Sequence, residues 1–284
     1  MRKIKLRKQL QDNLRDKWNK GYARAKHDIK DLHNSTPYIH SENTFKTYHS
    51  QVNHFCDWCK EKNIKEHSEA LQRVPEYMQH LNDSGKSAWS QSTALNALAK
   101  AFDKSTTDFD YKLPQRSRSD IVRSRGAAVR DAHFSPENNK DLIRFCDATG
   151  LRNRELSALK GSFKTYKDGK LYIHVYNGKG GKERDVLVHR DVKFVSSMMD
   201  RAGDGKVFPK LHNGADYHHY RGNYATNLYL SLARPLDKIP PSERYICRGD
   251  MKGKIFDKLA MKEVSLNLGH NRIDVIANNY LYNL

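Results

Sequence analysis

The stretch that decides the fold is Thr149-Gly150-Leu151-Arg152-Asn153-Arg154-Glu155-Leu156. Its glycine interrupts one helical pattern, and Arg152 stands where the next helix is expected to open. Backbone N–H groups at the start of a helix favour anions, so an arginine placed there suits an anionic ligand. Taken alone, Arg152 is an ordinary solvated helix residue. Glu155, three residues later on the same helix side, is expected to support an arginine or the helix start rather than to act as a general acid or base.

A β-hairpin is predicted after this stretch. Apolar residues alternate with polar ones in two runs, as half-buried strands require: Leu171, Ile173 and Val175, then Val186 and Val188. The runs flank Asn177-Gly178-Lys179-Gly180-Gly181-Lys182, with glycines where a tight turn needs positive φ. Beyond Val188 the pattern is mostly helical to the end of the sequence.

The N-terminal half is predicted to be helical. Three amphipathic stripes mark its helices: Phe45, Tyr48, Val52, Phe55 and Cys59, with Ser41 or Asn43 as the cap; Leu71, Val74, Tyr77, Met78 and Leu81, with Pro75 near the true start; and Leu95, Leu98, Ala99 and Phe102, from about Ser90. Ahead of them, Leu6, Leu10, Leu14, Trp18 and Tyr22 recur every four residues in a basic segment. That segment suits a helix that packs on DNA or on the protein body, and the sequence does not choose between them.

Four regions follow from these patterns. Residues 1–35 form a basic N-terminal helix or arm, 36–110 an α-helical domain, 111–132 a basic linker and 133–284 the C-terminal domain, which opens at Ser135-Pro136-Glu137. The linker is rich in arginine and poor in large apolar residues, as exposed connections are. Its arginines are expected to contact DNA, together with two residues of the hairpin: Arg116, Arg118, Arg123, Arg125, Lys182 and Arg184.

Composition points to a polyanionic partner. The 284 residues carry 51 Lys and Arg against 33 Asp and Glu, a net charge of +18, and nucleic acid is the commonest partner for such a surplus. A basic protein with no such role is the alternative. No apolar run approaches the ~18 residues of a membrane helix, and no signal peptide is apparent. Four cysteines make no disulfide framework, so a cytoplasmic location is expected. Cys56 and Cys59 are expected to be a buried structural pair rather than a zinc or redox site.

Four elements in order give the C-terminal half a resemblance to the tyrosine recombinase (phage integrase) family. They are Thr149 to Leu156, Lys179 in the glycine-rich hairpin, the H-x-x-R pair His218 and Arg221, and Leu268-Gly269-His270 followed by Tyr280. The resemblance implies a mainly α-helical fold with a small antiparallel sheet: an α-helical core-binding domain joined to a mixed α/β catalytic domain. It also implies a tetramer acting on two double-stranded DNA sites, with accessory DNA-bending proteins as possible partners.

The family's chemistry explains these residue types. Arg152 and Arg221 each offer paired N–H donors to the oxygens of a phosphodiester, a geometry that lysine cannot supply. Tyr280 is expected to attack phosphorus, with Tyr282 as its rival. His218 is the expected base and Lys179 the expected acid for the leaving 5′-oxygen, while His270 holds a phosphate oxygen. The phosphotyrosine bond stores the energy for rejoining, so neither a cofactor, a metal ion nor ATP is expected.

Two features depart from the family. The chain between Arg221 and Gly269 is longer than usual, and its surplus, which includes Arg244 to Asp250, is expected to be an inserted loop or subdomain. Only four residues follow Tyr280, where many relatives continue into a helix that contacts a neighbouring subunit. Two other functions stay open: a non-catalytic DNA-binding regulator, and a type IB topoisomerase, which shares the chemistry but relaxes supercoils as a monomer.

Overall fold

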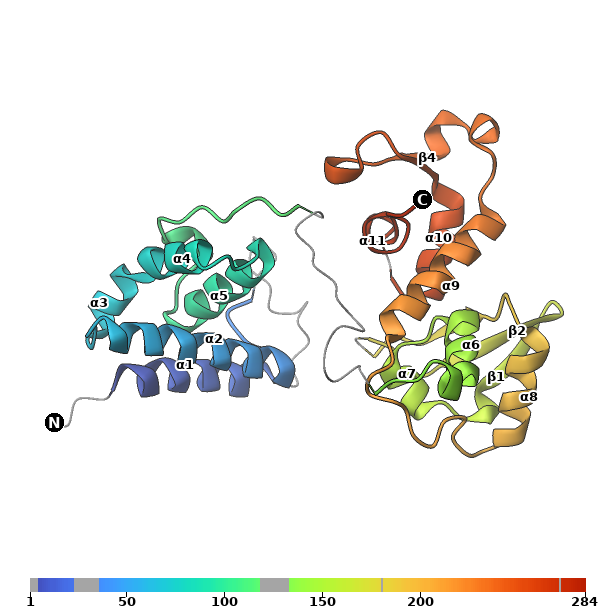
Figure 1. Ribbon diagram of the computed structural model, residues 1–284, viewed down its shortest axis with the longest axis horizontal. Helices are drawn as coiled ribbons and strands as arrows, with labels where there is room; N and C mark the ends of the chain where they lie inside the picture. The colour runs from blue at the N-terminus through green and yellow to red at the C-terminus, as the bar shows by residue number, and fades with distance from the viewer. Residues whose placement is uncertain (1–4, 23–35, 118–132, 180, 271) are drawn as a thin grey trace. The chain divides into compact units, whose positions relative to one another are not determined.

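The computed structural model of the chain describes residues 5–22, 36–117, 133–179, 181–270 and 272–284. The chain divides into an N-terminal unit, Met1–Ile121, and a C-terminal unit, Val122–Leu284 (Figure 1). Most of the predicted linker lies outside the described residues, as do three of the arginines predicted to contact DNA, Arg118, Arg123 and Arg125.

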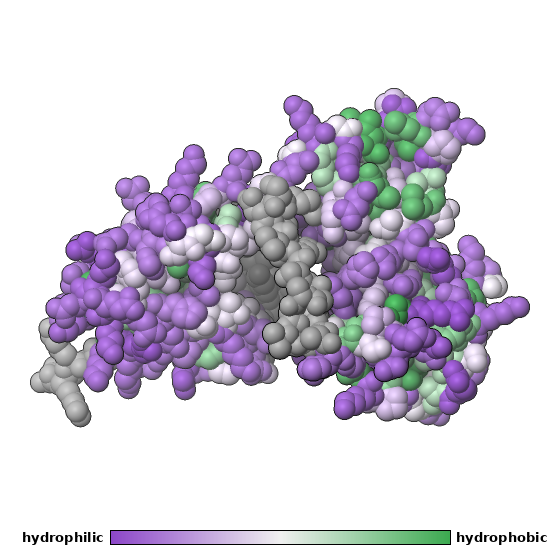
Figure 2. Space-filling view, viewed as in Figure 1, coloured by the Kyte–Doolittle hydropathy of each residue, from purple (hydrophilic) through white to green (hydrophobic). Residues whose placement is uncertain are grey.

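The N-terminal unit is a bundle of helices. These are α1 (Leu6–Gly21), α2 (Glu42–Glu61), α3 (His67–Gln72), α4 (Val74–Asp83) and α5 (Ala88–Ala101). Helix α1 buries Leu10 and Leu14 completely and packs against α2 and α5. Of the two placements open to the basic N-terminal helix, the structure therefore shows packing on the protein body. Hydrophilic residues cover most of the unit's visible face in Figure 2.

Local signals set where these helices begin. The Ser41 hydroxyl accepts a hydrogen bond from the Thr44 N–H at 3.2 Å, so Ser41 and not Asn43 caps α2. Pro75 is the second residue of α4, the position at which proline is tolerated. Helix α5 starts slightly earlier than expected because Ser87 caps it through the Ser90 N–H at 3.3 Å.

The Cys56-x-x-Cys59 pair is part of the N-terminal core. Both thiols are buried and unbridged. Burial raises the pKa of Cys56 to about 11 and that of Cys59 to about 12, so neither is a thiolate at neutral pH. Within the described residues there is no His, Cys, Asp and Glu cluster that could hold a metal ion, and no helix long and apolar enough to cross a membrane.

The C-terminal unit wraps helices around a three-stranded sheet. Its helices are α6 (Lys140–Thr149), α7 (Asn153–Ala158), α8 (Val192–Ala202), α9 (Tyr217–Leu232), α10 (Lys258–Asn267) and α11 (Asp274–Asn279). Strands β1 (Lys164–Lys167), β2 (Lys170–Val175) and β3 (Arg184–Leu187) are antiparallel in that order. The predicted hairpin is β2 and β3, with Ile173 opposite Val186, whereas β1 was not anticipated.

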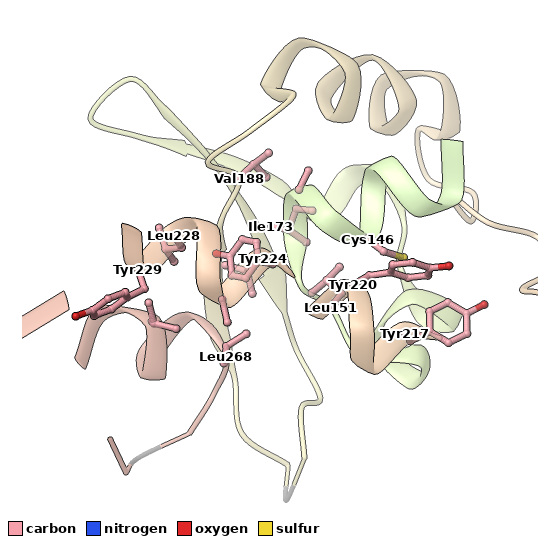
Figure 3. Packing of buried hydrophobic residues seen from close by; sticks show 14 of the residues in the cluster. Cys146, Leu151, Ile173, Val188, Tyr217, Tyr220, Tyr224, Leu228, Tyr229 and Leu268 are labelled. Carbon is pink, nitrogen blue, oxygen red and sulfur yellow. The ribbon is translucent and has the colours of Figure 1, made fainter. Parts of the chain in front are cut away.

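The core of this unit lies between the sheet and α9. Tyr224 of α9 is fully buried at its centre, near Ile173 and Leu268 (Figure 3). Its phenol O–H donates to the Leu187 carbonyl at 2.8 Å, so α9 is joined to β3 by a polar as well as an apolar contact. This packing holds the start of α9 near the end of α6, where the site is found.

Beyond Val188 the chain is mostly helical, and the surplus between Arg221 and Gly269 contains a hairpin that the sequence pattern did not reveal. A second hairpin, β4 (Arg244–Ile246) paired with β5 (Ile255–Asp257), occupies the surplus between α9 and α10. Each strand has three residues, which is too short for an alternating pattern to stand out. Residues 235–257 are called the insertion below.

Candidate active site

Gly150 brings Arg152 to its position. The residue ends α6 with φ of +58°, in the left-handed region that favours glycine. A Cβ built there would lie 2.5 Å from the Tyr224 ring, so a side chain is excluded on steric grounds as well. The chain turns sharply at this point, and Arg152 becomes the residue from which α7 starts. Its Nη2 donates to the Leu268 carbonyl at 3.0 Å, which joins the turn to the end of α10.

Glu155 is buried between two arginines. Its carboxylate accepts from the Arg152 backbone N–H at 2.8 Å and side chain at 2.9 Å, and from both Nη atoms of Arg184 at 2.8 and 2.9 Å. Burial alone would raise the pKa of this carboxyl, but the hydrogen bonds and charges of Arg184 and Arg152 lower it to about 2. An ionised carboxylate with four donors is a support for arginines, as expected, and not a general acid.

Arg221 lies at the centre of the site. It is 1% exposed, and its two Nη atoms donate to the carbonyls of Gly150 and Leu268. One guanidinium therefore ties α9 to the ends of α6 and α10. Burial, together with the charges of Arg152 and Arg184, lowers its pKa to about 10, so it still carries its charge at neutral pH. Asp216 caps α9 through the His219 N–H at 3.1 Å and sets the helix start one turn before Arg221.

Tyr280 contacts two other predicted catalytic residues. Arg221 Nε donates to its hydroxyl oxygen at 3.2 Å, and His270 Nε2 lies 3.2 Å from the same oxygen. Because the arginine donates, the phenol O–H is free to donate to the imidazole. Thr226 holds the Tyr280 carbonyl at 3.1 Å, which fixes the residue at the end of α11.

The surroundings of His270 keep it neutral. Burial, and then the positive charges of Arg221, Arg152 and Lys179, lower its pKa to about 4. At neutral pH its ring can therefore accept a proton. Its backbone is held by Ser265, whose carbonyl accepts from the His270 N–H at 2.8 Å.

A pocket of about 850 Å³ opens beside these residues. Four of the six predicted catalytic side chains line it, namely Arg152, Lys179, His218 and Arg221. Lys179 and His218 are exposed at its wall, on the hairpin turn and at the start of α9. The other two, His270 and Tyr280, join the group through Arg221. All six residues therefore lie in one region of the C-terminal unit. Glu155 pairs with Arg152 and Arg184, whereas Arg221 donates to two backbone carbonyls and to the Tyr280 hydroxyl, so no described carboxylate forms an ion pair with Arg221.

The described residues predicted to contact DNA differ in their placement. Lys182 is exposed next to the hairpin turn, and Arg116 lies over the Trp89 ring of the N-terminal unit at 5.7 Å. Arg184 faces inward with a 9% exposed side chain, so its main contact is Glu155. Sequence reasoning missed that pairing although the signal was present, because Arg184 shares the strand face of buried Val186 and Val188.

Comparisons with known proteins agree with this fold. Residues 36–109 match the family model of the phage integrase N-terminal SAM-like domain. No curated protein sequence matches the chain. The Tn1549 transposon integrase in complex with transposon right end DNA shares the fold at 11% identity with a TM-score of 0.50, covering 98% of this chain and 95% of that one. The XerH site-specific recombinase bound to palindromic difH substrate is 15% identical with a TM-score of 0.46, covering 98% and 92%. The family model thus covers the helices α2 to α5 of the N-terminal unit, and the Tn1549 integrase shares the fold over nearly the whole chain.

Proposed function

We propose that the protein is a site-specific DNA recombinase, of the integrase or excisionase type found on mobile elements, that breaks and rejoins strands through a 3′-phosphotyrosine. One observation carries the proposal: the Tyr280 hydroxyl lies 3.2 Å from both Arg221 Nε and His270 Nε2, beside a pocket lined by Arg152. A phenol placed between a guanidinium and a neutral imidazole has both a stabiliser for its negative charge and an acceptor for its proton.

The excess of arginine suits a phosphodiester in the reacting position. The non-bridging oxygens are anionic and gain charge as the phenol oxygen adds, so fixed N–H donors favour the transition state. Arg221 has Nη protons beyond those it gives to the two carbonyls, and Arg152 lines the same pocket. Glu155 supports this pair indirectly, because it fixes Arg152 from one side and keeps Arg184 from competing for the ligand.

The bond changes balance without an outside reactant. The Tyr280 oxygen bonds to phosphorus and loses its proton, the bond from phosphorus to the 5′-oxygen breaks, and Lys179 protonates that oxygen. The contact at 3.2 Å favours His270 as acceptor of the phenol proton. His218, exposed at the pocket wall, would then contact a phosphate oxygen. The two histidines would thereby exchange the roles that the sequence predicted for them. Rejoining is the reverse, with a 5′-hydroxyl attacking the phosphotyrosine.

The partner in this proposal is double-stranded DNA, held by both units. The net charge of +18 favours it, and phosphate contacts would make affinity fall steeply with salt. Exchange between two sites would require a tetramer on DNA, with DNA-bending proteins as candidate accessories. A type IB topoisomerase would instead relax any plasmid, and a regulator would form no covalent bond.

The test is covalent capture. A nicked suicide duplex from the protein's own genetic neighbourhood, incubated in excess EDTA without ATP, is expected to yield a protein–DNA adduct that survives denaturation. Strand breakage that requires a metal ion and leaves no adduct would contradict the proposal. An adduct on arbitrary DNA, with plasmid relaxation, would favour the topoisomerase.

A further inference from the structure

The insertion forms a second basic pocket, separate from the one that Arg221 lines. Its volume is about 550 Å³, and its lining residues are Pro241, Arg244, Tyr245, Ile246, Arg248, Lys258 and Asn278. Three of these described residues are cations and none is acidic. A pocket that gathers three positive charges without a carboxylate favours an anion.

Two of the cations are already held in place. Arg244 Nε donates to the Ile239 carbonyl at 2.8 Å, and its Nη2 to the Leu236 carbonyl at 3.1 Å. Lys258 Nζ donates to the Ser242 carbonyl at 2.7 Å. Backbone carbonyls orient these groups but leave their charge uncompensated. Both side chains also have further N–H donors for a ligand.

Three carboxylates near the pocket, those of Glu243, Asp257 and Asp274, are paired with other arginines. Glu243 and Asp257 contact Arg234 at 2.6 and 2.7 Å. Asp274, which lies close enough to Tyr245 to affect its pKa, contacts Arg272 at 2.5 Å. Arg248 is exposed, and none of the described residues forms a hydrogen bond or ion pair with its side chain. The positive charge of the pocket is therefore available to a ligand.

The remaining lining residues suit a nucleotide better than a small inorganic anion. Ile246 is 64% exposed, and Tyr245 presents an aromatic side chain beside the cations. Such apolar surface can contact the sugar while the cations contact the phosphate. Asn278 links the pocket to the active site, because it lies on α11 two residues before Tyr280, roughly 5–6 Å away between Cα atoms.

We propose that the insertion pocket binds a backbone phosphate of DNA, outside the phosphate that Tyr280 attacks. This inference rests on the proposed function and adds a contact that the catalytic residues do not make. Because Asn278 of α11 lines the pocket, the contact would stabilise the segment that carries the Tyr280 phenol. The contact is to the DNA backbone and would therefore not depend on base sequence.

The test measures how DNA affinity depends on salt. The probe is a fluorescein-labelled 30-base-pair duplex of arbitrary sequence, titrated with the full chain carrying Tyr280→Phe, so that covalent capture plays no part. In this background, Arg248→Gln with Lys258→Gln should reduce the slope of log affinity against log salt by about 1.8, or about 0.9 per lost contact. The ratio of the parent's affinity to the variant's affinity should then be about 12-fold smaller at 200 mM salt than at 50 mM salt.

Matched controls separate this contact from general charge. Lys252→Gln with Lys262→Gln removes two exposed cations that do not line the pocket, and the slope should stay unchanged. Arg248→Lys with Lys258→Arg keeps the charge and should restore the slope. Arg244 is left intact because it holds the insertion together, and equal urea midpoints would show that the variants fold.

Two results would overturn the inference: an unchanged slope in the pocket variant, or an equal loss in the control pair. Neither bears on the proposed function, which is decided by the covalent adduct. If the parent chain failed to bind the duplex at all, DNA as the partner would be wrong and the proposed function would fail with it.

Discussion

Two buried carboxylates in the C-terminal unit, Glu155 and Asp257, form ion pairs with arginines. The two clusters of charged residues differ in their net charge. Glu155 pairs with both Arg152 and Arg184, and the neighbouring Arg221 donates to backbone carbonyls, so positive charge is in excess. Asp257 meets Arg234, which Glu243 also contacts, so negative charge is in excess. Burying an uncompensated charge is costly. The first group is therefore suited to an anionic ligand, whereas the second fastens the insertion to α10.

The largest expected difference between the two groups is in reaction rate. Arg221→Lys keeps the charge but loses the fixed fork of donors, so the rate of adduct formation should fall by roughly 10²–10³. Arg234→Lys makes the same change in the other group and should alter the rate by less than about threefold. Single-turnover assays on the suicide duplex measure both. Equal losses would mean that the arginines matter to the fold and not to the chemistry.

The carboxylates should differ in a second way. Glu155→Gln leaves the guanidinium groups of Arg152 and Arg184 without their counter-charge and should lower the free energy of unfolding by roughly 3–5 kcal/mol. Asp257→Asn keeps a side-chain oxygen that can cap α10 but removes the charge that pairs with Arg234, and should cost roughly 1–3 kcal/mol. Urea unfolding gives both values. In protein that remains folded, only Glu155→Gln should slow adduct formation, and a similar slowing in Asp257→Asn would erase the distinction.

Acid should remove the contribution of Glu155. Its pKa is about 2 in the folded chain against an ordinary 4.5, so its stabilisation is complete above pH 5 and is lost as the pH falls towards 2. The amount is about 3 kcal/mol, at 1.36 kcal/mol for each pKa unit. The stability difference between the parent chain and Glu155→Gln should therefore shrink between pH 5 and pH 2. A constant difference would show that the carboxylate is not ionised in the fold.

The smallest expected effect is a flat pH profile. With a pKa of about 4, His270 is neutral from pH 6 to pH 8, so it accepts the phenol proton equally well throughout. Adduct formation should show no inflection near the ordinary histidine value of ~6.5. A fall in rate below pH 6.5 that disappears in His218→Gln would return the role of base to His218.

Much of the site could be predicted from sequence because its residues are tied to local backbone signals. Gly150 fixes the turn before Arg152, and the alternation of Ile173 and Val186 fixes the hairpin that carries Lys179. Features that depend on contacts distant in sequence were missed. The pairing of Arg184 with Glu155 and the contact of His270 with Tyr280 both require the packed ends of α10 and α11. The strands β4 and β5 were missed because each is only three residues long.

The central claim is that the phenol held between Arg221 and His270 attacks DNA. Mass spectrometry of the DNA-linked peptide tests it directly, because Tyr280 and Tyr282 lie on one peptide and their fragments are distinguishable. The linked nucleotide should map to Tyr280, vanish in Tyr280→Phe and persist in Tyr282→Phe. A nucleotide attached to Tyr282, or an adduct that survives Tyr280→Phe, would contradict the claim.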